Sequence, residues 1–250
     1  MRYYREEHET AYRTIAERGY TQWNDLFDGP SAWSYDAFQN RAFLERVIPA
    51  LGLPAPADTR VLEYGCGTGP AACFLAGLGF QVDAFDLIPA AIAIARRMAA
   101  ERGLSVDFRV ADICDLPPEP ASAPYDLVLD SFCLQSVVLD EDRAALFAAV
   151  RARLKPGGAY LVSTAIFSPD RTYDPGTFAA STGIVSRAIP DDLAVDAAEV
   201  VVVDGHRFIP HRRHLHVDAL RDELLAAGFA VVGIEVAGTS ANIVCQRPPA

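Results

Sequence analysis

The sequence predicts an α/β fold built on a doubly wound, mostly parallel sheet. From Arg60 onward, short apolar or β-branched runs alternate with alanine-rich amphipathic stretches, which is typical of parallel strands connected by helices. The first run, Val61–Tyr64, leads directly into closely spaced glycines and then into an alanine-rich stretch. A strand, a glycine turn and a helix in this order commonly begin such a sheet.

The segment before the sheet is predicted to be a helical cap or lid, which we place at 1–56. The first 43 residues contain ten aromatic residues, including both tryptophans, mixed with charges in a helix-like pattern. Asp28-Gly29-Pro30 interrupts this pattern. A further helix is expected over about 35–51, and it should end at Gly52 and Pro54 because neither residue favours a helix.

The predicted core covers 57–165. Its strands are expected near 60–64, 80–86, 106–111, 125–131 and 158–165. Its helices are expected near 69–78, 89–102 and 140–153. The proline-rich stretch between Cys114 and Pro124 leaves little room for a helix, so this crossover should be short or irregular.

The regular pattern lapses after Ala165, which predicts a functional insertion at 166–216. Its length is greater than that of an ordinary loop in a compact domain. Within it, strands are expected at 199–208 and 212–217, joined through Ile209-Pro210. The closing segment, 217–250, should then complete the core with a helix at 218–227 and strands at 229–237 and 242–247.

Charge and cysteine content exclude several function classes. Lys and Arg number 22 against 33 Asp and Glu, a net charge of −11, so the surface should repel nucleic-acid phosphates and no nucleic-acid partner is expected. We see neither an apolar signal-peptide core nor a run near 20 apolar residues, and therefore expect a cytoplasmic protein without a membrane partner. The five cysteines are scattered and form no CxxC pair, so no metal site is expected.

The glycine loop indicates a nucleotide-type ligand. Glycines allow a sharp turn close to a ligand, and the following helix offers free N–H groups, although a plain tight turn would use the same residues. A dinucleotide fingerprint needs a glycine at position 70, where this chain has Pro70. That difference disfavours a nucleotide-dependent oxidoreductase. The pattern present is E-x-G-x-G-x-G, formed by Glu63, Gly65, Gly67 and Gly69.

This pattern resembles motif I of the class I S-adenosylmethionine-dependent methyltransferases. Four further stretches match that family in order: Gln81–Asp86, Val110–Ile113, Tyr125–Ser131 and Leu154–Gly158. The resemblance covers roughly 60–165. It implies a Rossmann-like seven-stranded sheet with one antiparallel strand, S-adenosylmethionine as cofactor with S-adenosylhomocysteine as product, a small-molecule substrate, and a monomer or homodimer.

The resemblance also implies which residues bind the cofactor. Glu63 would help to hold its amino group, and Asp86 would accept both ribose hydroxyl protons. Asp112 would receive the adenine amino group. The other implied contacts are Gly65, Gly67 and Gly69 around the methionine part, Leu87 and Ile88 against adenine, the backbone N–H of Ile113, and Ser131 and Phe132 near the sulfonium.

The acceptor side is less defined by the sequence. Methyl transfer needs alignment and exclusion of water, and a base only where the acceptor must lose a proton. Many relatives have a histidine after the fourth strand, whereas this chain has Gln135, which cannot act as a base. Candidate bases are His206, His211 and His214. The same basic segment could instead hold an anionic acceptor or form an exposed hairpin.

Aromatic residues complete the predicted acceptor pocket. Trp33, Tyr35 and Tyr173 could present π faces to a sulfonium or amine, beside Gln135, or the first two could be the ordinary core of the cap. The sequence thus predicts methyl transfer to an O or N atom of a small molecule. Alanine-rich helices and a preference for arginine favour bacterial secondary metabolism. The alternatives are the oxidoreductase and a non-catalytic cofactor-binding or regulatory protein.

Overall fold

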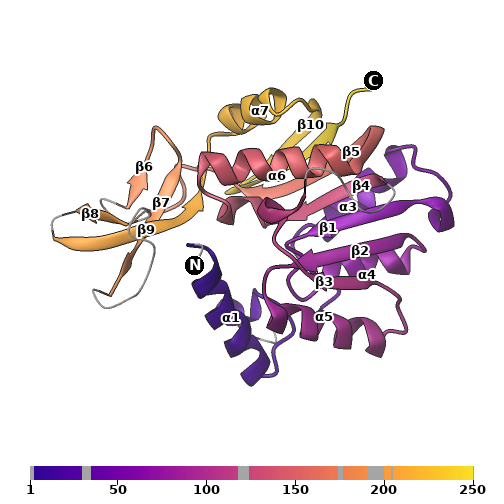
Figure 1. Ribbon diagram of the computed structural model, residues 1–250, viewed down its shortest axis with the longest axis horizontal. Helices are drawn as coiled ribbons and strands as arrows, with labels where there is room; N and C mark the ends of the chain where they lie inside the picture. Colours follow the sequence, from indigo (N-terminus) through magenta and orange to yellow (C-terminus); the bar gives the residue numbers. More distant parts are fainter. Residues whose placement is uncertain are drawn as a thin grey trace.

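A central seven-stranded sheet organises the chain (Figure 1). The computed structural model describes residues 3–29, 35–117, 124–173, 177–190, 200–203 and 205–249. The strand order is β10-β11-β5-β4-β1-β2-β3, and β11 runs antiparallel to both of its neighbours. The strands are β1 (Arg60–Tyr64), β2 (Gln81–Asp86), β3 (Asp107–Val110), β4 (Tyr125–Ser131), β5 (Leu154–Ala165), β10 (Ala230–Ala237) and β11 (Ser240–Gln246). The predicted mostly parallel sheet with one antiparallel strand is confirmed.

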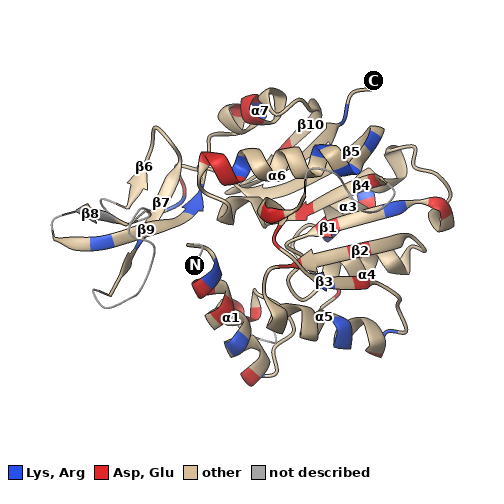
Figure 2. Cartoon of the chain, in the orientation of Figure 1, with Lys and Arg blue, Asp and Glu red and all other residues tan. Residues whose placement is uncertain are grey.

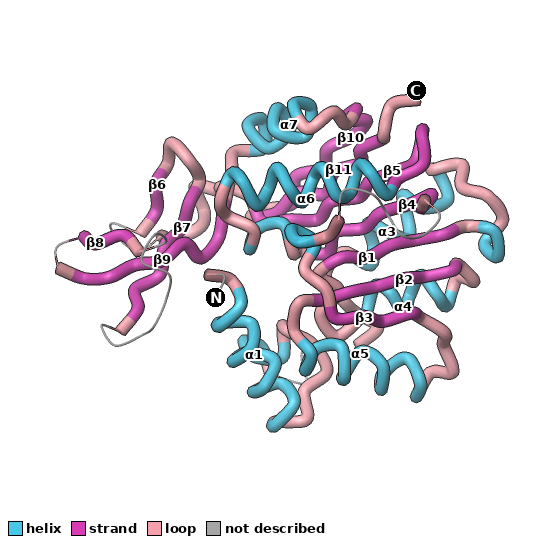
Figure 3. The backbone as a smooth tube through the Cα atoms, in the orientation of Figure 1, coloured by secondary structure: helices cyan, strands magenta, loops and turns pink. Residues whose placement is uncertain are grey.

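Helices cover both faces of this sheet (Figure 3). Neighbouring side chains alternate between the faces, so Val61 and Leu62 of β1 belong to different core layers. The Val61 layer packs against α3, α4 and α5, whereas the Leu62 layer packs against α6 and α7. The α-helices are α1 (Arg5–Glu17), α2 (Asp25–Asp28), α3 (Arg41–Val47), α4 (Pro70–Gly77), α5 (Pro89–Glu101), α6 (Asp140–Arg153) and α7 (Val217–Ala226). This two-sided cover is the doubly wound arrangement.

Most elements of the cap and the core form where the sequence predicts them, with two differences. β5 begins at Leu154, which pairs with Tyr125 before a register shift, rather than near residue 158. The helix expected over 35–51 is reduced to α3 and a short 3₁₀ turn, Ile48–Ala50. Pro49 lies in that turn and has no N–H to continue an α-helix.

The strand order reverses at β1, which places a crevice at its carboxyl end. β1 pairs in parallel with β2 on one side and with β4 on the other. Connections from these strands depart in opposite directions, and ligands of open α/β sheets bind at such a point. The glycine loop after β1 and the Ser131-Phe132 corner after β4 both lie at this edge.

The insertion forms a second, four-stranded antiparallel sheet with the order β6-β7-β9-β8. Its strands are β6 (Phe178–Ala179), β7 (Ile184–Ile189), β8 (Val201–Val203) and β9 (His206–Arg213). The predicted strand pair at 199–208 and 212–217 is therefore wrong. Pro210 does not join two strands but lies within β9 opposite Ser186, beside a register shift that accommodates the missing N–H. Residues 214–216 lead from β9 into α7.

Charge is distributed unevenly over these parts (Figure 2). Basic residues recur along β7 and β9, and the first turns of α1 carry acidic residues near this second sheet. Within the described ranges, every helix is too short or too polar to cross a bilayer. The domain boundaries at 56, 165 and 216 stay predictions.

Candidate active site

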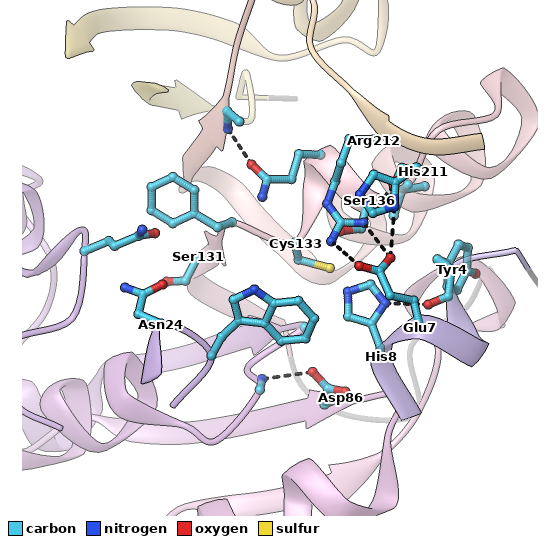
Figure 4. Close-up of a pocket in the computed structure, with 18 of the residues that line it drawn as sticks. Tyr4, Glu7, His8, Asn24, Asp86, Ser131, Cys133, Ser136, His211 and Arg212 are labelled. Atoms are coloured by element: carbon cyan, nitrogen blue, oxygen red, sulfur yellow. Dashed lines mark hydrogen bonds and ion pairs between the residues drawn. The ribbon is translucent and has the colours of Figure 1, made fainter. Parts of the chain in front are cut away.

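A cavity of about 1140 Å³ lies at the carboxyl ends of β1, β2 and β4 (Figure 4). The sheet edge and its following loops form one side. Residues of α1, of the segment after it and of the second sheet form the other. Segments that are far apart in the sequence therefore line a single cavity.

The glycine loop needs its glycines for two different reasons. Gly65, Gly67 and Gly69 all have positive φ, at +59°, +56° and +78°, which L side chains rarely adopt. A Cβ at Gly67 would also lie 2.5 Å from the Tyr12 hydroxyl across the cavity. Gly69 instead caps α4, and a Cβ there would lie 2.8 Å from the Phe108 ring, so this glycine serves helix packing and does not line the cavity.

Glu63 is a completely buried carboxylate in the cavity wall. Neither of its oxygens has a hydrogen-bond partner in the described part of the chain. Burial raises the pKa of Glu63 to about 8, and the charges of Asp130 and Asp86 add to this effect, whereas the nearby Ser131 hydroxyl and Ala72 N–H oppose it. An unpaired carboxylate at this depth is costly unless a ligand supplies donors or a positive charge.

Asp86 fixes the turn between β2 and α5 to the glycine loop. Its Oδ2 accepts the Gly67 N–H at 2.9 Å, and its Oδ1 accepts the Ile88 N–H at 2.8 Å. Burial raises its pKa to about 6, although these two bonds act in the opposite direction. Each carboxylate oxygen keeps a second lone pair toward the cavity that Asp86 lines.

The N-terminal segment reaches the opposite end of the same edge. The Tyr4 hydroxyl donates to Asp112 Oδ2 at 2.8 Å, while Asp112 Oδ1 accepts the Cys114 N–H at 2.9 Å. Nearby, the Tyr3 hydroxyl accepts the N–H groups of Val138 and Leu139 at 2.7 and 3.1 Å. Residues 3 and 4 are thereby attached to the loops after β3 and β4.

The corner after β4 is held by a polar network. The Asn40 amide donates to the hydroxyls of Ser131 and Ser163, at 2.9 and 3.1 Å. Phe132 has a φ of +63°, the one positive value found among the described residues other than glycine. Its N–H donates to the Ser163 carbonyl at 2.7 Å, which helps to keep this strained conformation. Strained corners of this kind cluster at functional sites.

A charged group lies on the opposite side of the cavity, where α1 meets β9 (Figure 4). His211 Nδ1 is buried 3.1 Å from Glu7 Oε2, within ion-pair distance but without hydrogen-bond geometry, and the Arg212 guanidinium contacts both Glu7 oxygens. Burial alone would raise the pKa of Glu7, but His211 and Arg212 hold it well below its usual range. Glu7 is therefore an anion that can orient the His211 ring.

Two further histidines line the cavity and are neutral at pH 7. His8 packs against Trp23 with ring centroids 5.1 Å apart and the rings tilted by 37°, and His214 Nδ1 lies 3.1 Å from the Tyr173 hydroxyl. Burial lowers both pKa values to about 4, and neighbouring arginine charges add to the effect. These rings can exchange hydrogen bonds with a ligand without repelling a cationic cofactor.

The predicted site residues fall into three groups. Those that line the cavity are Glu63, Gly65, Gly67, Asp86, Leu87, Ile88, Asp112, Ile113, Ser131, Phe132, Gln135, Tyr173, His211 and His214. Gln135 is fixed there because its Oε1 accepts the Ala165 N–H at 2.7 Å. Trp33 lies outside the described residues.

Three predicted residues lie away from the cavity lining. Gly69 packs behind the loop, as described above. Tyr35 is buried on that same side, where its hydroxyl donates to the Thr68 carbonyl at 2.8 Å. His206 lies at the exposed start of β9. A pocket role for Tyr35 and a base role for His206 are therefore not supported by their positions.

Sequence reasoning missed the polar residues that α1 and the 168–173 loop bring to the cavity. These are Glu7, His8, Tyr12 and Arg171. A signal was present, because Tyr4, His8 and Tyr12 recur every four residues and so share one helix face. Glu7 on the same helix pairs with Arg212, 205 positions away, and no local pattern identifies such a pairing.

Known proteins with related sequences identify the family of this chain. A family model described as a methyltransferase domain matches residues 61–158. The ubiquinone biosynthesis O-methyltransferase of Xanthomonas euvesicatoria pv. vesicatoria (strain 85-10) is 33% identical over 201 residues, which are 80% of this chain and 72% of that protein. Its counterpart from Xanthomonas axonopodis pv. citri (strain 306) is 34% identical over 185 residues, covering 74% of this chain and 66% of that relative, slightly under two thirds of its length.

A solved structure shares the fold. It is an S-adenosylmethionine-dependent methyltransferase from Clostridium acetobutylicum ATCC 824, with a TM-score of 0.63 at 15% identity over 95% of this chain and 99% of that one. At this identity the likeness concerns the fold alone. The family model and the sequence relatives identify the family: the chain belongs to the class I S-adenosylmethionine-dependent methyltransferases.

Proposed function

We propose that this protein transfers a methyl group from S-adenosylmethionine to a hydroxyl oxygen of a small-molecule acceptor. The observation that carries the proposal is one cavity of about 1140 Å³ with two chemically different ends. Pockets for one small ligand commonly measure about 300–1,000 Å³, so this space is large enough for a cofactor and an acceptor together. Glu63 and Asp86 mark one end, and Glu7 and His211 mark the other.

The cofactor end fits the cationic amino acid part of S-adenosylmethionine. The two unpaired oxygens of Glu63 would receive its ammonium group, and the charge would lower the high pKa of this buried carboxyl. Asp86 would accept from the ribose hydroxyls while it keeps the glycine loop in place. The cofactor supplies an electrophilic methyl group; the protein aligns the reactants and excludes water.

The acceptor end offers a base that suits a hydroxyl. The negative charge of Glu7, 3.1 Å from Nδ1, favours the His211 tautomer with the proton on that nitrogen, which would leave Nε2 able to accept a proton. A hydroxyl must lose its proton during transfer, whereas a neutral amine needs no base at the same step. The names of the sequence relatives, which are O-methyltransferases, also support oxygen as the acceptor atom.

The pathway and setting of this reaction stay predictions. The relatives are named for ubiquinone biosynthesis rather than for secondary metabolism, so they do not specifically support the expectation drawn from composition. A cytoplasmic location and a monomeric or homodimeric state are likewise predictions from the sequence.

The test is a methyl-transfer assay with labelled cofactor and a panel of phenols, catechols and primary amines. We expect a product 14 Da heavier from at least one hydroxyl compound, and a loss of at least about 100-fold in kcat for His211→Asn, as for removal of a general base. His206→Asn is the matched control, since that ring lies outside the cavity lining, and its kcat should not change. Methylation of amines only would contradict an oxygen acceptor.

A thermal-shift experiment tests the two rival functions. Stabilisation by S-adenosylmethionine and S-adenosylhomocysteine but not by NADH would contradict an oxidoreductase. Tight cofactor binding without any methylated product, across the panel and a cell extract, would instead support a non-catalytic role.

A further inference from the structure

Three arginines line the cavity, and they differ in whether a carboxylate neutralises them. Arg187 pairs with Glu6 at 2.7 Å, and Arg212 pairs with Glu7 at 3.1 Å. Arg171 has no carboxylate within ion-pair distance in the described part of the chain. Its side chain is partly buried, so this charge is not simply dispersed in bulk water.

The hydrogen bonds of Arg171 are also incomplete. Its Nε–H is buried without a partner, and the bond that its guanidinium makes is a long one, from Nη2 to the Thr239 carbonyl at 3.4 Å. A guanidinium carries five N–H donors in a planar fork that matches a carboxylate. Most donors of this fork therefore have no acceptor among the described residues. Arg171 lines the cavity, where a ligand could supply one.

The surroundings of Arg171 suit an aromatic anion. Tyr173 and His214 line the same part of the cavity, and the Arg171 charge acts on both: it opposes the burial that raises the pKa of Tyr173 and adds to the burial that lowers that of His214. Because both rings are uncharged at pH 7, they neither neutralise Arg171 nor repel an anion. They add polar hydrogen-bonding atoms beside an aromatic surface.

We propose that Arg171 is a specificity-determining residue that binds a carboxylate of the acceptor, so that the substrate class is hydroxylated aromatic acids. This inference rests on the proposed O-methyltransferase function and names its acceptor chemistry. The carboxylate completes the guanidinium fork at one end of the acceptor, while the hydroxyl at the other end is methylated. Arg187 and Arg212 do not take this role because Glu6 and Glu7 already neutralise them.

The experiment measures binding separately from catalysis. Protocatechuate, homoprotocatechuate and dihydrocaffeate differ in the distance between ring and carboxylate, and each is compared with its methyl ester by calorimetry in the presence of S-adenosylhomocysteine. We expect at least one acid to bind about 10- to 100-fold more tightly than its ester, as is typical of a charge-assisted bidentate contact. Arg171→Gln should remove the preference, and Arg171→Lys should keep part of it.

Arg207→Gln is the matched control, because it removes the same charge from the second sheet at a position outside the cavity lining. Its preference for the acid should equal that of the unmodified protein. The proposal is overturned if no acid binds more tightly than its ester, or if the preference survives in Arg171→Gln. If Arg171→Gln fails to fold, the Arg171→Lys variant decides. The proposal is then overturned if Arg171→Lys keeps the whole preference for the acid over its ester and binds the acid with unchanged affinity.

Methyl transfer is then assayed with the acid that binds. An acid preference governed by Arg171 without any methylated product supports the carboxylate site and contradicts the proposed function. Methylation of neutral phenols without any preference for the acid supports the proposed function and contradicts the carboxylate site. The two failures are therefore distinguishable.

Discussion

Glu7 and Arg212 lie 205 positions apart in the sequence, and the guanidinium of Arg212 donates to both carboxylate oxygens of Glu7, at 3.1 and 3.2 Å. This pair connects α1 to β9 above the cavity, and Glu6 with Arg187 makes a second connection beside it. Neither segment belongs to the central sheet. Together they close the cavity on the side opposite to the glycine loop.

Glu7→Gln should weaken the protein at neutral pH and have a much smaller effect in strong acid. The folded-state pKa of Glu7 is lowered from its ordinary value of 4.5, so its stabilising contribution is present above that pH and is lost as the pH falls through the folded pKa. We expect a decrease of about 1–3 kcal/mol in the free energy of unfolding at pH 7. Urea titrations at pH 7 and at about pH 2 would measure it, because the folded-state carboxylate is still ionised at pH 4.

Glu9→Gln is the control on the same helix. Glu9 pairs with Arg5 on the surface, where such pairs contribute about 0.5 kcal/mol or less. An equal effect of Glu7→Gln at both pH values would contradict the ion-pair interpretation.

Glu63→Gln should have opposite effects on stability and on cofactor binding. The folded-state pKa of Glu63 is raised from 4.5 to about 8, so its carboxyl makes the free energy of unfolding fall as the pH rises between these values. The variant should therefore gain stability relative to the unmodified protein over this range. Its affinity for S-adenosylmethionine should fall about 10- to 100-fold, because a charge-assisted hydrogen bond is lost.

Calorimetry in two buffers with different ionisation enthalpies adds an independent check. At pH 7 Glu63 is mostly protonated before the cofactor binds, so binding to the unmodified protein should release protons that Glu63→Gln does not release. Proton release that is unchanged in the variant would rule out Glu63 as the ammonium ligand.

Asp86→Asn should weaken cofactor binding by a few kcal/mol, or roughly 100-fold in Kd. The substitution removes the negative charge from the two proposed ribose contacts. It also replaces one carboxylate oxygen, which accepts a backbone N–H, by an amide group that donates. Asp83→Asn is a matched control on β2, because Asp83 pairs with Arg60 outside the cavity lining. Isothermal titration should show a normal Kd for Asp83→Asn. A normal Kd for Asp86→Asn would refute the ribose assignment.

Gly67→Ala should abolish cofactor binding, and Tyr12→Phe in the same chain should partly restore it. The added Cβ would lie 2.5 Å from the Tyr12 hydroxyl but 3.5 Å from the ring carbon that bears it, so removal of the hydroxyl relieves the closest contact. The positive φ costs a further 1–2 kcal/mol or so. Gly103→Ala has a similar φ with open space around it, and should lower the melting temperature without affecting binding.

The central sheet could be predicted because each of its elements is encoded locally. Strand and helix periods and the glycine loop all lie within short windows of sequence, and parallel strands buried on both faces have a strong apolar signal. The cavity-lining positions of Glu63 and Asp86 follow directly, since both residues end or nearly end a strand at the same edge.

The second sheet, and the side of the cavity that α1 and this sheet form, were harder to predict. Pro210 indicated a break, but a register shift opposite it allows β9 to continue. Tyr35 is aromatic, as many pocket residues are. Its hydroxyl nevertheless donates to the Thr68 carbonyl behind the glycine loop. The roles of Glu7 and Arg171 depend on which charges meet in space, and these are determined by tertiary packing rather than by neighbours in sequence.

The two ends of the cavity come from separate stretches of the chain. Glu63, Asp86, Asp112 and Ser131 all fall within residues 61–158, the part that the methyltransferase domain model matches, whereas Glu7, His8, Arg171 and His211 fall outside it. Descendants of such a protein can therefore inherit the cofactor machinery intact while mutation changes the other stretches. New acceptors become accessible to natural selection, or to a laboratory library confined to two segments, without each lineage having to evolve cofactor binding again.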